Sequence, residues 1–399
     1  MAMLAKHAWE SAMSEWSGAN QGIIMPRREA IYLLGGSAAS VLLGACRWGT
    51  PESGLEMENG NMDLTGGLPV EREHFYEAKP GPEVRDAANV WFEAENAELA
   101  MRIGVEHVAE EWDTPELWLD IAFPDGSVIS GREHGASGPG GDPTKKRCGP
   151  LQFECVEPFK HWKITFDPHK VRELTAQQLI DLDIPDSPPM RDVAFELDYF
   201  PAVPPLISGT LTADSKKMMS GEQGTFISPR YEQLCRAKGW LSIDGKRRDM
   251  SGQLLRIKRQ GVRKFEGFWG HCWMSCLFPS GKAFGVNTFP PRDDGKPNFN
   301  EGFIFDGTGE LIPARAVETP WMRELLVSDE PVKLVLETDA GRRETIEGVT
   351  YINCRSLGGE GILPDKWPIV QQAHARYTWN GEEATGMIER STFREQMKL

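Results

Sequence analysis

A stretch in the second half of the chain, residues 267–285 (GFWGHCWMSCLFPSGKAFG), gathers side chains that could move protons beside an apolar molecule. Trp269, His271 and Trp273 are spaced by two, so in a regular strand they point to one face. An imidazole gives and takes protons near neutral pH, and the face of a tryptophan ring attracts a cation. Further along, Glu301 offers a carboxyl group whose pKa an apolar pocket would raise.

Together these residue types match what the addition of water to an alkene requires. One group must protonate carbon, the surroundings must tolerate a cation, and a base must take a proton from water. His271 and Glu301 are therefore the predicted catalytic pair, with Trp269 and Trp273 as walls of the site. The alternative is that this face is barrel core, where His271 bonds to a backbone carbonyl and Glu301 caps a turn.

Other residues leave two interpretations open. If Glu389, on the last predicted strand, faces a barrel interior, it must be paired or protonated there, and Arg390 points to the opposite face. The basic stretch 256–264 (RIKRQGVRK) is typical of a solvated strand and turn, and the alternative is a binding site for a carboxylate or phosphate. Cys272 and Cys276 share a strand face, which predicts two buried core thiols.

The segments around these residues carry the alternating or aromatic-rich patterns of short strands. Such patterns occupy residues 98–105, 117–123, 151–167, 191–200, 237–246, 271–289, 301–318, 332–354 and 375–391. Turn signals such as Asp244-Gly245 and Asn380-Gly381 favour tight hairpins between them. Residues 173–183 (ELTAQQLIDLD) predict a short helix in the first half.

This succession predicts an all-β fold of two antiparallel barrels or sandwiches with a few short helices. A proline-rich break at residues 199–209 and a polar stretch after it separate the halves. We expect the N-terminal β-domain at residues 70–225 and the C-terminal β-domain at residues 226–399. Barrels of this size often hold one apolar ligand inside.

The N-terminal segment is typical of an export signal. In residues 25–46, an arginine pair precedes a short apolar run, as in a twin-arginine signal, and the segment ends in Leu-Gly-Ala-Cys, which resembles a lipoprotein cleavage box. This predicts acylation of Cys46, a polar linker at residues 47–69, and a periplasmic or membrane-anchored lipoprotein attached through that lipid. The alternative is an ordinary N-terminal helix in a cytoplasmic protein.

Composition and motifs exclude several function classes. The 399 residues carry a formal net charge of −15, which disfavours sequence-independent nucleic-acid binding because that depends on lysine and arginine. The sequence has no phosphate-binding glycine loop, GxSxG, HExxH or CxxC motif, and its 8 histidines show no metal-ligand spacing. We therefore expect no nucleic acid, no metal and no nucleotide cofactor.

Three segments, residues 230–245 (RYEQLCRAKGWLSIDG), 267–285 and 377–391 (YTWNGEEATGMIERS), resemble the hydroxyneurosporene synthase / carotenoid 1,2-hydratase-like superfamily, with its tocopherol-cyclase-like, AttH-like and kievitone-hydratase-like members. The likeness covers most of residues 70–395 in order. It implies two tandem lipocalin-like barrels, water addition to an alkene or cyclisation or isomerisation of a terpenoid- or polyketide-like lipid, and no nucleotide or metal cofactor.

The resemblance also assigns residues. The family's His-x-Trp strand motif is matched by His271 and Trp273. Where the hydratases have a Tyr-x-Asp-like pair, this chain has Phe299 and Glu301, so the acid is kept and the tyrosine hydroxyl is absent. Glu389 ends a matching Gly-x-x-Glu. The substrate contacts predicted in this way are Trp269, Trp273, Phe299, Tyr231, Glu232 and Glu389.

Two functions are compatible with these observations. The first is a cofactor-independent hydratase, dehydratase, isomerase or cyclase that acts by proton transfer on an apolar, alkene-bearing lipid of terpenoid, steroid or phenylpropanoid type. The alternative is a lipocalin-like carrier that binds a small hydrophobic ligand without catalysis. The His-x-Trp motif and the acid favour the enzyme, and the missing tyrosine favours the carrier.

Overall fold

The computed structural model describes residues 62–136, 141–220, 227, 229–264, 268–291, 299–356 and 367–397. The expected signal segment with Cys46, and most of the expected linker, lie outside these residues, so export and acylation stay predictions. In the part of the chain that is described, no helix combines the length and the apolar character that a bilayer crossing needs.

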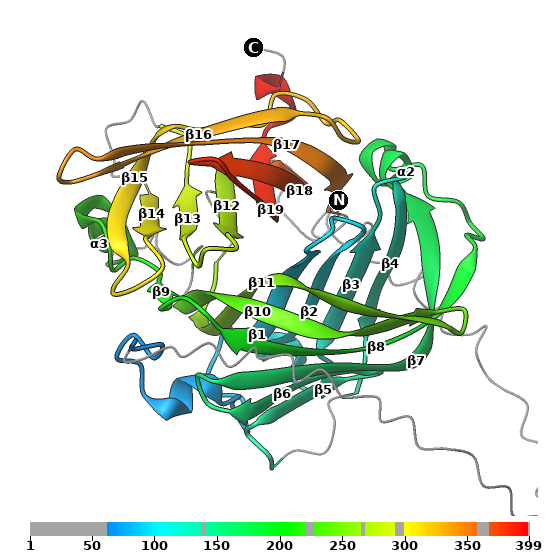
Figure 1. The fold of residues 1–399 in the computed structure, drawn as a ribbon. Coiled ribbons are helices and arrows are strands. Elements are labelled where there is room, and N and C mark those ends of the chain that lie inside the picture. Colours follow the sequence, from blue (N-terminus) through cyan, green and yellow to red (C-terminus); the bar gives the residue numbers. More distant parts are fainter. Residues whose placement is uncertain are drawn as a thin grey trace, which may run out of the picture. The chain divides into compact units, whose positions relative to one another are not determined.

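The first sheet contains eleven strands and pairs them antiparallel in the order β4-β3-β2-β1-β11-β10-β8-β7-β6-β5 (Figure 1). In addition β9 pairs with β10, and β4 pairs with β7, so the sheet curls back on itself. The strands are β1 (Val84–Ala94), β2 (Ala100–Val108), β3 (Glu116–Ala122), β4 (Ser127–His134), β5 (Lys145–Cys148), β6 (Leu151–Glu157), β7 (His161–Thr175), β8 (Met190–Pro201), β9 (Leu206–Ile207), β10 (Arg230–Ile243) and β11 (Lys246–Val262).

The remaining strands form a closed antiparallel barrel, in which the first strand β12 pairs with the last strand β19. They are β12 (His271–Leu277), β13 (Ala283–Thr288), β14 (Asn300–Phe305), β15 (Ile312–Glu318), β16 (Pro331–Thr338), β17 (Arg343–Arg355), β18 (Ile369–Trp379) and β19 (Glu382–Thr392). The barrel contacts the first sheet through β12 and β19, which pack on β1, β10 and β11 (Figure 1).

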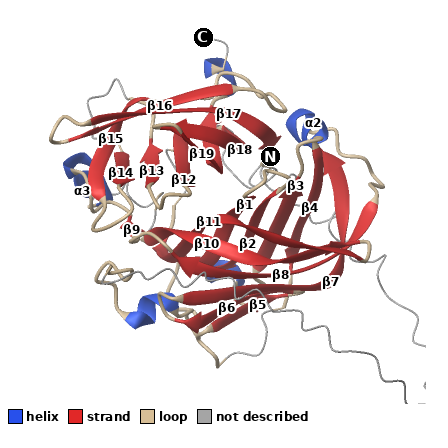
Figure 2. Ribbon diagram, in the orientation of Figure 1, coloured by secondary structure: helices blue, strands red, loops and turns tan. Residues whose placement is uncertain are grey.

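Helices are few and short, and strands account for most of the ordered elements (Figure 2). They are η1 (Val70–Glu73), η2 (Ala109–Glu111), α2 (Ala176–Asp181), α3 (Ala213–Met219) and η4 (Arg394–Gln396). The helix predicted at residues 173–183 is confirmed as α2, which begins with a capping box between Thr175 and Gln178.

The all-β prediction is confirmed, and the predicted hairpin turns are present. Asp244 and Gly245 have φ of 51° and 77°, and Asn380 and Gly381 have φ of 51° and 81°. Both pairs therefore adopt the positive φ that a two-residue hairpin needs, and they join β10 to β11 and β18 to β19.

The division between the two sheets does not coincide with the expected boundary at residues 225 and 226. The hairpin of β10 and β11 lies between β8 and β1 and so completes the first sheet. The barrel begins only at His271. The sequence pattern does not show that the hairpin belongs to the first sheet, because its alternation is the same whichever strands it pairs with.

Successive side chains of β12 alternate between two buried faces, one inside the barrel and one outside it. Cys272, Met274 and Cys276 point into the barrel, where they join its apolar core, and this confirms their prediction as buried core thiols and packing residues. His271 and Trp273 have the opposite parity and point out of the barrel. Because the barrel exterior at β12 packs on the first sheet, all seven residues of the strand are buried.

A buried carboxylate ties the start of the described chain to the interior of the first sheet. Glu73 accepts hydrogen bonds from Arg256 Nη1 at 2.9 Å, Trp162 Nε1 at 2.6 Å, the Phe159 amide at 3.0 Å and the Tyr231 hydroxyl. Burial raises the pKa of Glu73, but the Arg256 charge and these bonds bring that pKa below its ordinary value. The pair thus stays ionised in the core.

We expect Glu73→Gln to lower the free energy of unfolding by about 3–5 kcal/mol, since it leaves the Arg256 charge buried without its partner. Urea unfolding followed by tryptophan fluorescence measures this loss. Glu71→Gln is the matched control, because Glu71 lies on the same 3₁₀ turn and is exposed. Equal stability of the two variants would show that the Glu73–Arg256 pair does not hold this segment.

Candidate functional site

Four side chains form a compact patch on the outer face of the β12–β19 pair. His271 is the register partner of Ser391, and Trp273 is the register partner of Glu389. Directly paired residues in an antiparallel ladder bring their side chains within contact. The closure of the barrel therefore assembles the patch from the first and last strands of the barrel.

The imidazole of His271 is held at both nitrogens. Nδ1 lies 2.5 Å from Ser391 Oγ, which also accepts the His271 backbone N–H at 3.0 Å. Nε2 lies 3.1 Å from Glu389 Oε1. An ionised carboxylate only accepts hydrogen bonds, so Nε2 carries the proton, and in the neutral ring Nδ1 accepts from the Ser391 hydroxyl. The arrangement is a serine–histidine–carboxylate chain.

Glu389 is the ionised end of this chain. Burial alone would raise the pKa of Glu389, but its hydrogen bond to His271, the charges of His271 and Arg102, and the Gln372 amide lower it from 4.5 to about 2. Gln372 Nε2 donates to Glu389 Oε2 at 2.9 Å from the adjacent strand β18. The Glu389 side chain retains 12% of its exposure, so the chain of three groups reaches a partly open edge.

Trp273 links the patch to the first sheet. Its Nε1 donates to Glu232 Oε2 at 2.8 Å, and Glu232 Oε1 lies 2.6 Å from Arg230 Nη2. The Arg230 guanidinium in turn lies over the Trp273 ring, 5.0 Å from its centroid. The structure thus brings Glu232, a predicted contact residue, beside Trp273 from strand β10.

Guanidinium groups also cover the tryptophans of the first sheet that face the barrel. Arg102 on β2 lies 5.3 Å from the ring centroids of both Trp91 and Trp118. Trp91 packs edge-on against Trp273 at 6.1 Å, and Trp118 fits over Gly104, where a Cβ atom would come within 2.2 Å of the indole. The indole faces in this interface therefore already meet positive charge.

Glu301 lies on β14 and is engaged elsewhere. Its carboxylate accepts the backbone N–H of Gly209 at 2.6 Å, of Leu211 at 2.7 Å and of Thr212 at 3.4 Å, which fastens the loop before α3 to the barrel. Burial raises the pKa of Glu301, and the Glu232 charge adds to this. These contacts resemble the alternative considered from the sequence, in which Glu301 caps a turn. The carboxylate that is bonded to His271 is Glu389 and not Glu301.

Trp269 and Phe299 belong to an aromatic cluster beside the patch. Trp269 Nε1 donates to the Pro290 carbonyl at 2.8 Å, and both rings pack on Phe289. The expectation that Trp269 shares the face of His271 assumed a continuous strand. Gly270, at φ 123°, interrupts it, and β12 begins one residue later.

Tyr231 lies on the opposite face of β10 from Glu232. It is fully buried inside the first sheet, where its hydroxyl donates to Glu73. The geometry therefore assigns Tyr231 to the Glu73 network and Glu232 to the interface with the barrel, because neighbours on a strand point to opposite sides.

Residues 256–260 of the basic stretch are buried, contrary to the solvated strand favoured by the sequence, whereas Lys264 at its end is exposed. Arg256 and Lys258 point into the first sheet and pair with Glu73 and Asp86. Arg259, with the opposite parity, points to the other face of β11 and is 5% exposed. Charge alone suggested a surface, but each of these cations has a carboxylate within 4.0 Å in the fold.

Glu389 does not face the barrel interior, which the sequence left open. Arg390 points into the barrel, where it donates to Glu330 Oε1 at 2.8 Å and Gln371 Oε1 at 3.0 Å, and Glu389 points out of it. An arginine can enter the barrel because this carboxylate and this amide satisfy its N–H groups. On the outer face, the buried carboxylate of Glu389 pairs with His271.

Sequence reasoning missed Ser391, Gln372, Trp91, Arg102 and Arg230 as members of the site. Trp91, Arg102 and Gln372 come from β1, β2 and β18, strands on which no site residue was predicted, whereas Ser391 lies on β19 beside the predicted Glu389. The signal available for Ser391 was its spacing of two from Glu389, which predicts that both share a face.

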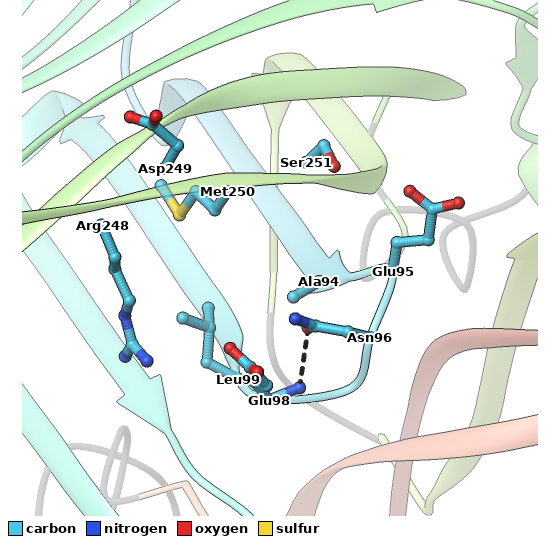
Figure 3. A pocket seen from close by; sticks show the side chains of 9 residues that line it. All are labelled: Ala94, Glu95, Asn96, Glu98, Leu99, Arg248, Asp249, Met250 and Ser251. Carbon is cyan, nitrogen blue, oxygen red and sulfur yellow. Dashed lines mark hydrogen bonds between the residues drawn. The ribbon is translucent and has the colours of Figure 1, made fainter.

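A cleft of about 310 Å³ lies apart from the His271 patch, at the turn between β1 and β2 and the start of β11 (Figure 3). The charged side chains that line it are Glu95, Glu98, Arg248 and Asp249, and none of the predicted site residues is among its walls. Its lining mixes these charged groups with Ala94, Leu99 and Met250, unlike the mostly apolar wall expected for an apolar ligand. Elsewhere in the described ranges, no three His, Cys, Asp or Glu side chains gather as a metal would require.

Solved structures are similar to this chain at low sequence identity. An AttH-type protein from Nitrosomonas europaea aligns with a TM-score of 0.51 and 12% identity, over 78% of this chain and 93% of that one. CghA aligns with a TM-score of 0.49 at 10% identity, over 78% of this chain and 89% of its own. Kievitone hydratase from Nectria haematococca aligns with a TM-score of 0.44 at 10% identity, over 84% and 97%. At these identities the likeness concerns the fold alone.

No curated protein matches the sequence. One family model does match, over residues 73–394, and its description is a domain of unknown function, DUF7064. The matched span includes all nineteen strands of the sheet and the barrel, from β1 to β19, together with the whole His271 patch. The chain therefore belongs to the DUF7064 family.

Proposed function

We propose that this protein is a cofactor-independent hydro-lyase or isomerase that moves a proton on an apolar, alkene-bearing lipid of terpenoid, steroid or phenylpropanoid type. The observation that carries the proposal is the His271 imidazole held between the Ser391 hydroxyl and the ionised Glu389. The sequence resemblance to alkene hydratases supports the same reaction class. The reaction would take place at the outer face of β12 and β19 and not in the barrel interior, which Phe278, Phe284, Tyr377 and Trp379 fill.

The proton path follows from the hydrogen bonds. A proton leaving water or a C–H group passes to the Ser391 oxygen while the serine's own proton passes to Nδ1 of His271. The imidazolium that forms is stabilised by Glu389 across the Nε2–H bond. The reverse transfer returns a proton to carbon, so the three groups end in their starting state and serve hydration, dehydration or isomerisation alike.

We expect His271→Ala and Ser391→Ala to lower turnover by about 100-fold or more, because each removes one step of the proton path. The assay incubates the purified full chain with a panel of apolar alkenes and tertiary alcohols in ¹⁸O-labelled water and follows the label by mass spectrometry. His169→Ala is the matched control, since His169 also contacts a carboxylate, Glu133, at 3.0 Å but lies outside the patch.

Full label incorporation by both patch variants would refute the proton path. If no compound in the panel turns over, yet apolar ligands bind and quench tryptophan fluorescence, the protein is a carrier and the proposal of catalysis is wrong.

The ionised state of Glu389 has its own test. A carboxylate whose pKa is lowered from 4.5 to about 2 in the folded chain stabilises it by about 3 kcal/mol above the unfolded pKa. That contribution is lost as the pH falls through the folded pKa. We therefore expect the gap in unfolding free energy between wild type and Glu389→Gln to be constant near neutral pH and to shrink between about pH 4.5 and about pH 2. A gap independent of pH would contradict the ionised carboxylate.

A further inference from the structure

Hydrogen-bond donors without acceptors collect where the first sheet meets the barrel. Within the described residues, the Nε atoms of Arg102, Arg230 and Arg259 and the indole N–H groups of Trp91 and Trp118 are buried and have no hydrogen-bond partner. Buried N–H groups are nearly always satisfied, so each of these is an open position for an oxygen atom. The two carboxylate oxygens in the same interface that lack a hydrogen bond, on Glu106 and Glu232, do have an arginine nitrogen within 4 Å.

Positive charge is in excess beside these donors. Four arginines, Arg85, Arg230, Arg259 and Arg263, lie together with three glutamates, Glu106, Glu232 and Glu389, in the described part of the chain. Burial and the neighbouring guanidinium groups lower the pKa of Arg259 well below its ordinary value. Such a cluster is stabilised by a negative charge that enters it.

The same arginines make the site unsuited to a carbocation. Arg230 covers the face of Trp273 and Arg102 covers the faces of Trp91 and Trp118, each within 5.3 Å of a ring centroid. A cation on the substrate would meet guanidinium groups at the ring faces that ought to stabilise it. The tryptophan ring faces of the interface are therefore already covered by arginine guanidinium groups.

We propose that the substrate carries a carbonyl or carboxylate group conjugated with its alkene, and that the interface arginines bind this oxygen and stabilise an enolate. This inference rests on the proposed function and specifies its substrate class and the charge of its intermediate. The apolar remainder of the substrate lies against the Trp91 and Trp273 rings and the neighbouring apolar side chains of the interface.

The reaction balances with the groups already described. In hydration, the water oxygen forms a bond to the β-carbon while its proton enters the Ser391–His271 path, and the alkene electron pair moves to give an enolate whose oxygen faces the arginines. The imidazolium then returns a proton to the α-carbon and the carbonyl re-forms. Dehydration is the same sequence reversed, and isomerisation takes the proton from the γ-carbon in place of water.

The sign of the preferred charge is measured with two amphiphiles of equal chain length. Isothermal titration calorimetry of the full chain compares dodecanoate with dodecyltrimethylammonium below their micelle concentrations. We expect dodecanoate to bind at least about tenfold more tightly, although the chain's net charge of −15 favours the cation. Arg230→Met should remove most of that preference. Arg102→Met gives the same comparison at a residue of intermediate exposure if Arg230→Met does not fold.

Arg247→Met is the matched control, because Arg247 stacks on Trp240 at 4.2 Å but is exposed and outside the interface. Tighter binding of the ammonium, or a loss in Arg247→Met equal to that in the interface variants, would overturn the inference.

Catalysis supplies the second readout. A long-chain conjugated enone and the isolated alkene of equal length are incubated with the full chain in D₂O, and deuterium at the α-carbon is followed by NMR. Exchange and turnover of the enone alone support the enolate, whereas turnover of the isolated alkene alone refutes it and leaves the proposed proton-transfer function standing. Arginine-dependent binding of dodecanoate without turnover of either compound supports the oxyanion site and refutes the proposed function.

Discussion

The site depends on the burial of both faces of β12. One face of the strand supplies core side chains to the barrel, and the other packs on the first sheet. A strand buried on both sides keeps its polar side chains from water, so His271 and Trp273 are stabilised by partners in the protein, whereas the buried Ser275 hydroxyl has no hydrogen-bond partner in the described residues. This constraint forces His271 into contact with Ser391 and Glu389, and Trp273 into contact with Glu232. The chemistry of the patch thus follows from the packing of barrel on sheet.

The polar side chains on the two sides of the first sheet differ in whether their hydrogen-bonding groups have partners. Inside the sheet, Glu73 accepts four hydrogen bonds and Asp86 pairs with Lys258, so the buried charges there are matched and act as staples. On the side facing the barrel, arginine and indole N–H groups in the described residues remain without acceptors. A fully satisfied network specifies a fold, whereas buried donors left open are costly unless a ligand completes them. This contrast is the reason for proposing the side that faces the barrel as the binding surface, although both sides contain the same residue types.

Much of the architecture could be predicted from local pattern. Period-two alternation, the positive-φ turns at Asn380-Gly381 and Asp244-Gly245, and the Thr175 cap are all local properties, and each is present in the structure. The hairpin of β10 and β11 was assigned to the wrong half because edge pairing is decided over long sequence separations. The expectation for Trp269 assumed that it belongs to the strand of His271, but β12 begins only at His271, after Gly270 with its positive φ.

By itself, the sequence determined that His271 and Trp273 share a strand face, and it predicted a carboxylate, Glu301, as the partner of His271. Only the tertiary structure decided which carboxylate that is. Glu389 lies 118 residues from His271 and reaches it because the first and last strands of the barrel pair, whereas Glu301, much nearer in sequence, faces a loop. Tertiary structure also placed guanidinium groups over the indole rings of the interface, since Arg230 and Arg102 come from strands of the first sheet. Spacing along one strand determines which of its side chains share a face. Barrel closure and the packing of the sheets determine which residues of other strands contact that face.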